Sequence, residues 1–207
     1  MNKIVIKNGL VTGLFLQLAV GPVFFYIINL AIQRTIFDGL LGVLAVTIVD
    51  LFYISLAFFG IGKLLEKNKI KIVFVIISSI TLIIFGGLMI KSGLDSTLTN
   101  SIEINSPYLF SSFISTFLLT IFNPMTIIFY TSLFTAKAIE YKYVKRDLYI
   151  FGLAVGSATF IFMSIAVLLF SFIKEIIPLI VAQLLNIFVG IVLIIYGVIR
   201  TAKIYFK

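Results

Sequence analysis

The sequence predicts an all-α membrane protein with six transmembrane helices. Hydrophobic residues make up 61% of its 207 residues and charged residues only 12%, about half the charged share of a typical globular chain. Such a chain has too little polar surface to face water on all sides, which excludes soluble enzymes and soluble binding modules. The apolar residues form long runs and not the alternating ~10-residue segments of a membrane β-barrel.

Six stretches are long enough to cross a bilayer, which takes about 20 helical residues. The first carries no charge, the second contains only Asp50, and the third lies between Lys71 and Lys91. The fourth lies in the uncharged segment before Lys137, and the sixth has Pro178 in its first turn, where proline is tolerated. The fourth span is expected to start near Tyr108, within the uncharged stretch between Glu103 and Lys137. The other five are expected at about Gly9 to Ile32, Gly39 to Gly62, Ile72 to Ile90, Leu148 to Ile173 and Ile176 to Ile199.

Lysine and arginine fall mostly on one side of these spans. Thirteen of the 16 basic residues lie at the N-terminus, in the second and fourth connections and at the C-terminus, whereas only Arg34, Lys91 and Lys174 lie on the other side. This bias predicts that both termini are cytoplasmic. Despite the net charge of +8, the basic residues occupy short gaps between apolar runs, so we expect the lipid bilayer and not nucleic acid as the partner.

The chain is expected to be a single membrane domain over residues 1–207, made of two weakly similar halves at about 9–91 and 108–200. Residues 44–46 match 153–155 at an offset of 109, and residues 82–86 match 193–197 at an offset of 111. Gly21-Pro22 aligns with Asn123-Pro124 at an offset of 102. Because each half has three spans, the second copy would be inserted upside down, as in many secondary transporters with an inverted 3+3 repeat.

Gly21-Pro22 and Asn123-Pro124 fall well inside their spans. Proline kinks or breaks a helix, and it is well suited to the first position of the helix that follows. Gly21 and Asn123 would then be the N-caps of two half-helices, whose N-terminal N–H groups attract anions. A pair of such ends near the middle of the membrane suits a carboxylate, although each site alone could be a simple kink.

Asp50 is the only acidic residue inside a span. An acidic residue at a helix centre costs about 2.5–3.5 kcal/mol on insertion scales, so we expect Asp50 to face the bundle interior. There it would bind an ammonium group, carry a proton, or both; the alternative is a hydrogen-bonded residue that only packs. Its counterpart in the second half is Thr159. The spans contain six further polar candidates: Gln17, Asn29, Thr47, Thr126, Gln183 and Asn186. Of these, Gln17 and Thr126 are the strongest candidates for substrate binding.

The chain contains no cysteine and no histidine. Disulfides, thiolate chemistry, histidine general bases and the usual transition-metal ligands are therefore excluded, and we expect no enzyme activity, no cofactor and no metal site. The spacings Gly9-x-x-x-Gly13 and Gly152-x-x-x-Gly156 would let helices approach closely and are compatible with a homodimer.

These features together resemble the LysE/RhtB family of amino-acid exporters over essentially the whole chain. The resemblance rests on Gly21-Pro22 in the first span, the acidic residue in a glycine-spaced second span, and Asn123-Pro124 in the fourth. It implies a multi-pass protein of the bacterial inner membrane that exports amino acids, coupled to the proton-motive force, with Gly21, Pro22, Asp50, Asn123 and Pro124 at the family's motif positions. The chain departs from many relatives at Val20, where they have proline, and at Met125, where they have lysine.

The expected function is export of small zwitterionic solutes, with neutral amino acids favoured over lysine and arginine. A basic amino acid would bring a second cation into a low-dielectric site with one acidic residue. Two alternatives stay open: a cation or metal exporter of the same wider superfamily, and a membrane channel.

Overall fold

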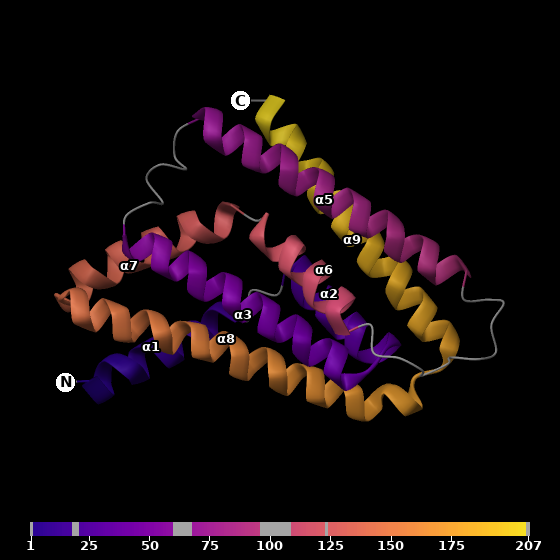
Figure 1. Ribbon diagram of the computed structural model, residues 1–207, viewed down its shortest axis with the longest axis horizontal. Helices are drawn as coiled ribbons and strands as arrows, with labels where there is room; N and C mark the ends of the chain where they lie inside the picture. The colour runs from indigo at the N-terminus through magenta and orange to yellow at the C-terminus, as the bar shows by residue number, and fades with distance from the viewer. Residues whose placement is uncertain (1, 18–20, 60–67, 96–108, 123, 206–207) are drawn as a thin grey trace.

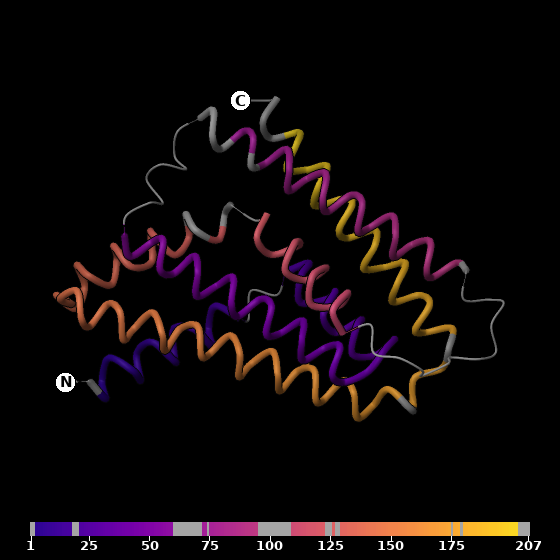
Figure 2. Tube along the Cα trace, in the orientation of Figure 1, coloured from indigo at the N-terminus to yellow at the C-terminus, as the bar shows by residue number. Residues whose placement is uncertain are grey.

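The computed structural model describes residues 2–17, 21–59, 68–95, 109–122 and 124–205, and within these ranges every element is a helix (Figures 1 and 2). The all-α prediction is therefore confirmed for this part of the chain. The helices are α1 (Asn2–Gln17), α2 (Pro22–Gln33), α3 (Ile36–Phe58), α5 (Asn68–Asp95), α6 (Leu109–Ile121), α7 (Pro124–Tyr141), α8 (Lys145–Ile173), the 3-10 helix η1 (Lys174–Ile176) and α9 (Leu179–Tyr205).

Four helices among the described residues are long and apolar enough to cross a membrane, over Ile36–Phe58, Val75–Leu94, Lys145–Ile173 and Ile180–Ala202. Helices α1 and α2 meet the same criteria as a pair, although their directions differ by 81°. The helices thus support a multi-pass membrane protein with four or five spans by length and composition.

The fourth predicted span is broken where its proline predicts a break. It is divided between the 13-residue helix α6 and helix α7, which begins at Pro124. Proline lacks the N–H needed for the helical ladder and clashes with the preceding turn, so the two helices are not continuous. Neither helix is by itself among the four that are long and apolar enough to cross a membrane. A correction concerns Pro178, which precedes α9 instead of lying in its first turn. Its carbonyl accepts from the N–H groups of Val181 and Ala182, at 2.9 and 3.2 Å.

The helices pack in two groups joined by α2 and α6. Helices α5 and α9 lie side by side along one edge, and α1, α3 and α8 form the other group (Figure 1). Helix α2 contacts both groups, through α3 and α8 on one side and α9 on the other. The beginning of α1, the end of α3 and the beginning of α8 lie toward the left of Figure 1, and the end of α9 lies at its top, near the middle. Most of the basic residues in the sequence belong to these helix ends and the connections between them.

Glycines bring two helix pairs into close contact. A Cβ on Gly86 of α5 would lie 2.6 Å from the carbonyl oxygen of Gly190 on α9, and the reverse contact has the same length. On α1, a Cβ at Gly9 or Gly13 would lie 2.6 Å from Ala154 or Ala158 of α8. The Gly9-x-x-x-Gly13 spacing therefore packs helices of one chain together.

Polar contacts fasten the helices at the end opposite the chain termini. Thr35 and Asp38 form a capping box at the start of α3. Asp38 is 1% exposed and accepts a 2.6 Å hydrogen bond from Ser112 Oγ of α6, which itself accepts from Arg34 Nη1 at 2.8 Å. Lys174 Nζ donates to the Arg34 carbonyl. This network joins α3, α6 and the end of α8.

A cavity at the helix breaks

The break before α2 has the predicted form. Gly21 is the N-cap in an extended conformation (φ −113°, ψ 176°), Pro22 is the first helical residue, and the N–H groups of Phe24 and Phe25 donate to the Gly21 carbonyl. At the corresponding break, α7 begins at Pro124, while Asn123 lies outside the described residues. The preceding helix is held by the Tyr53 hydroxyl of α3, which donates to the Ile121 carbonyl. That bond satisfies one of the carbonyls that a helix end leaves without an intrahelical partner.

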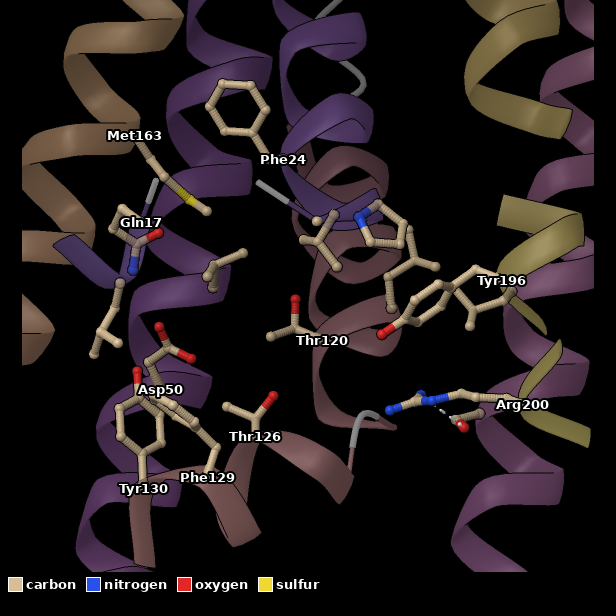
Figure 3. A pocket seen from close by; sticks show the side chains of 18 residues that line it. Gln17, Phe24, Asp50, Thr120, Thr126, Phe129, Tyr130, Met163, Tyr196 and Arg200 are labelled. Carbon is tan, nitrogen blue, oxygen red and sulfur yellow. Dashed lines mark hydrogen bonds between the residues drawn. The ribbon is translucent and has the colours of Figure 1, made fainter. Parts of the chain in front are cut away.

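A cavity of about 430 Å³ lies beside the start of α2 (Figure 3). Its volume falls within the range of about 300–1,000 Å³ that is usual for small-molecule sites. Each of the eight described α-helices contributes at least one side chain, so the cavity is central to the helix arrangement. Its polar side chains are Gln17, Asp50, Ser78, Thr120, Thr126, Tyr130, Tyr196 and Arg200, and most of the remaining lining is apolar.

Asp50 lies at one side of the cavity. It is 6% exposed, and the hydroxyls of Tyr130 and Thr159 are hydrogen-bonding neighbours of its carboxylate. Thr159 also accepts a 2.7 Å hydrogen bond from Gln17 Nε2, which connects α1 to α8 next to the acidic group. The residue that the repeat aligns with Asp50 is thus among its spatial neighbours. A buried carboxylate with hydroxyl neighbours and an open face on a cavity is able to bind a cationic group or to exchange a proton.

Arg200 lines the cavity from α9 and was not predicted as a site residue. Its Nη1 donates to Ser78 Oγ of α5 at 3.1 Å, and its guanidinium lies 5.3 Å from the centre of the Tyr196 ring. In Figure 3 the guanidinium points toward the cavity from the side opposite Asp50, with Thr120 and Thr126 between them in this view. Among the described residues, Asp50 and Arg200 are the two charged side chains that line the cavity.

From the sequence, Arg200 is interpreted as one of the basic residues that set the topology, because it follows a long apolar run. One local feature nevertheless predicts that its side chain is directed toward the helix bundle. A helical side chain leans toward the N-terminus of its helix, so Arg200 covers the preceding turn and meets Tyr196 four residues earlier. Arg200 lies near the C-terminal end of the apolar part of α9. A lean toward the N-terminus of α9 therefore directs its guanidinium back toward the middle of the span.

Five of the seven predicted site residues line the cavity: Gln17, Gly21, Pro22, Asp50 and Thr126. Pro124 begins α7, two residues before Thr126, and Asn123 is not described.

Three other polar candidates bond elsewhere. Asn29 Nδ2 donates to Asn186 Oδ1 across α2 and α9 at 2.6 Å, and Thr47 donates to the carbonyl of Val43 within α3. These three residues therefore bond within or between helices and do not line the cavity.

Comparison with known proteins gives one family. The LysE type translocator family matches residues 14–200, which include both helix breaks and every residue that lines the cavity. Neither the curated proteins nor the solved structures contain a match.

Proposed function

The chain belongs to the LysE type translocator family, and from that premise we propose that it exports small zwitterionic solutes, above all neutral amino acids. Membership of a translocator family makes it a membrane transport protein. We place it in the inner membrane, with both termini cytoplasmic and with export driven by the proton-motive force. The bias of 13 basic residues against three supports this orientation.

The cavity is the observation that carries the proposal. It joins a buried acidic residue to the N-terminal end of α2, since Asp50, Gly21 and Pro22 all line it. A zwitterion presents an ammonium and a carboxylate, and these two features of the cavity have opposite electrostatic character. Most of the remaining lining is apolar, which suits an aliphatic side chain.

The proposed roles follow from this arrangement. Asp50 receives the ammonium group and carries the coupled proton. The starts of α2 and α7 face the carboxylate, with Gly21 and Pro22 at the first and Pro124 at the second. Asn123, the remaining motif residue, lies outside the described residues. Gln17 and Thr126 supply further hydrogen bonds, and the bond of Gln17 to Thr159 holds its amide beside Asp50.

We also propose six spans in an inverted repeat, with α1–α2, α3 and α5 in one half and α6–α7, α8 and α9 in the other. The helix contacts support it: α1 packs on α8, and its counterpart α6 packs on α3.

A second pair of contacts, between α5 and α9, also supports the repeat. At an offset of 111, Gly86 corresponds to Gly197 and Ser79 to Gly190. A Cβ on Gly86 would meet the Gly190 carbonyl oxygen at 2.6 Å, and one on Gly197 would meet that of Ser79 at 3.0 Å. Each contact is thus the repeat image of the other.

The test is transport by the purified protein in proteoliposomes. Asp50→Asn keeps the size of the side chain but cannot gain or lose a proton, so amino-acid movement driven by a pH gradient should fall to background. The variant should still insert, because an amide costs less than a charge in lipid. Glu140→Gln makes the same chemical change at an exposed residue and should leave transport unchanged. Uphill transport by Asp50→Asn would refute the coupling role.

Counterflow separates a carrier from a channel. In this assay, unlabelled amino acid inside the vesicles should drive uptake of labelled amino acid against its own gradient. A channel gives no such exchange, so its absence together with downhill flux would replace the exporter with the channel alternative.

A further inference from the structure

We propose that Arg200 is a substrate-binding residue that receives the carboxylate of the transported solute, opposite the ammonium site at Asp50. The inference rests on the proposed transport function and specifies how the cavity selects its cargo. It makes a negatively charged carboxylate, and not merely a small apolar amine, a requirement for tight binding. It also moves the main anion-binding role from the helix breaks to α9.

The position of Arg200 is set by two helices. Tyr196 lies one turn before it on α9 and packs its ring against the guanidinium, and Ser78 on α5 accepts its 3.1 Å hydrogen bond. Both neighbours also line the cavity. Because α5 and α9 are held in contact through Gly86 and Gly190, the guanidinium has a defined direction toward the cavity (Figure 3).

This direction distinguishes Arg200 from a basic residue that only anchors a helix end. An anchoring arginine extends its charged head outward to the membrane–water interface. Arg200 instead contributes to the wall of a cavity that reaches Asp50, and its side chain is half-buried. Arg146, at the start of α8, is the contrasting case, because its side chain is exposed and lines no part of this cavity.

The chemistry of the guanidinium suits a carboxylate better than a helix end does. A helix N-terminus carries about half a positive charge, whereas arginine carries a full one. The planar fork of N–H donors also matches the two oxygens of a carboxylate in a bidentate pair. With Asp50 and Arg200 as the charged groups lining the cavity, its formal charges balance, as do those of a zwitterion.

The test compares amino acids with their amides, which keep the amine and the side chain but lack the carboxylate. Counterflow of radiolabelled leucine, threonine or homoserine is competed with the free amino acid and with its amide. The unaltered protein should prefer the free amino acid by at least about tenfold. In Arg200→Gln the half-saturating concentration of amino acid should rise on the order of ten- to a hundredfold, the range expected for a lost charge-assisted hydrogen bond. The preference over the amide should then disappear.

Two further variants complete the design. Arg200→Lys keeps the charge but not the fork, so it should recover part of the lost affinity and part of the preference for the carboxylate. Arg146→Gln removes one positive charge from the same expected side of the membrane and should behave as the unaltered protein. If Arg200→Gln does not insert into the membrane, the test uses Arg200→Lys alone. That variant should lose severalfold in affinity for the free amino acid and lose no affinity for the amide.

The outcomes separate the two proposals. Transport with an unchanged preference for the free amino acid in the Arg200 variants would overturn the role of Arg200 and leave the exporter function standing. Absence of counterflow for every amino acid in the unaltered protein would overturn the proposed function, and the role of Arg200 with it.

Discussion

The contact between α5 and α9 can be tested with two adjacent glycines that have opposite surroundings. An alanine Cβ at Gly86 would lie 2.6 Å from both the Gly190 carbonyl oxygen and Ile194 Cγ1, whereas a Cβ at Gly87 would meet no atom within 4 Å beyond its chain neighbours and the backbone of its own helix. A backbone oxygen cannot rotate away, so the Gly86→Ala variant must push the two helices apart. Overpacking of this kind costs about 1–3 kcal/mol.

Gly87→Ala is the matched control because both changes alter the intrinsic helix propensity in the same way. The difference between the two variants therefore isolates the helix contact, and we expect Gly86→Ala to be less stable than Gly87→Ala by about 1–3 kcal/mol. The assay is unfolding of the purified protein in mixed micelles by titration with a denaturing detergent, followed by helical circular dichroism. Equal free energies of unfolding for the two variants would show that α5 and α9 do not cross at Gly86.

Three other outcomes are expected. A periplasm-active reporter fused after Lys207 should be silent and one placed near Asn100 should be active, since 13 of 16 basic residues lie on the opposite side from that connection; activity after Lys207 would contradict the topology. In competition, leucine, threonine and homoserine should outcompete free lysine and arginine, because Asp50 is the one acidic side chain among the described residues that line the cavity. A preference for the basic pair would refute this charge argument. Thr35→Ala removes the capping box of α3 and should cost about 1 kcal/mol in the same detergent titration; an unchanged midpoint would mean that the cap does not stabilise α3.

Much of the helical architecture follows from local chemistry and was predictable. Long apolar runs predict long helices, and the chemistry of proline predicts where α2 begins, whatever the surrounding fold. The interior position of Asp50 follows from the cost of exposing a charge to lipid. In each case the physical effect that determines the structure depends on one residue or one segment of the sequence.

The other side of the cavity depends on helices distant in the sequence. Arg200 follows an apolar run in the same way as any topology-setting residue. Its lean toward the preceding turn directs it back along α9, and the packing of α9 on α5 then places it on the wall of the cavity. Ser78 and Thr120 are ordinary polar residues in apolar helices, and nothing local separates them from Thr47, which bonds to its own helix. Sequence alone therefore predicted that Asp50 lies inside the helix bundle, and it did not predict that Arg200 lines the same cavity.

The two charged residues that line the cavity among the described residues also differ in how they relate to the proposed repeat. Asp50 comes from the first half, and its counterpart Thr159 is a neutral neighbour of the same carboxylate. Arg200 comes from the second half, and at the offset of 111 its counterpart is Met89, a buried apolar residue. A site with the symmetry of the scaffold would present two identical charges and would repel one end of a zwitterion. In the proposed repeat, one acid and one base therefore come from different halves, and the proposed zwitterionic substrate would have a single preferred orientation between them.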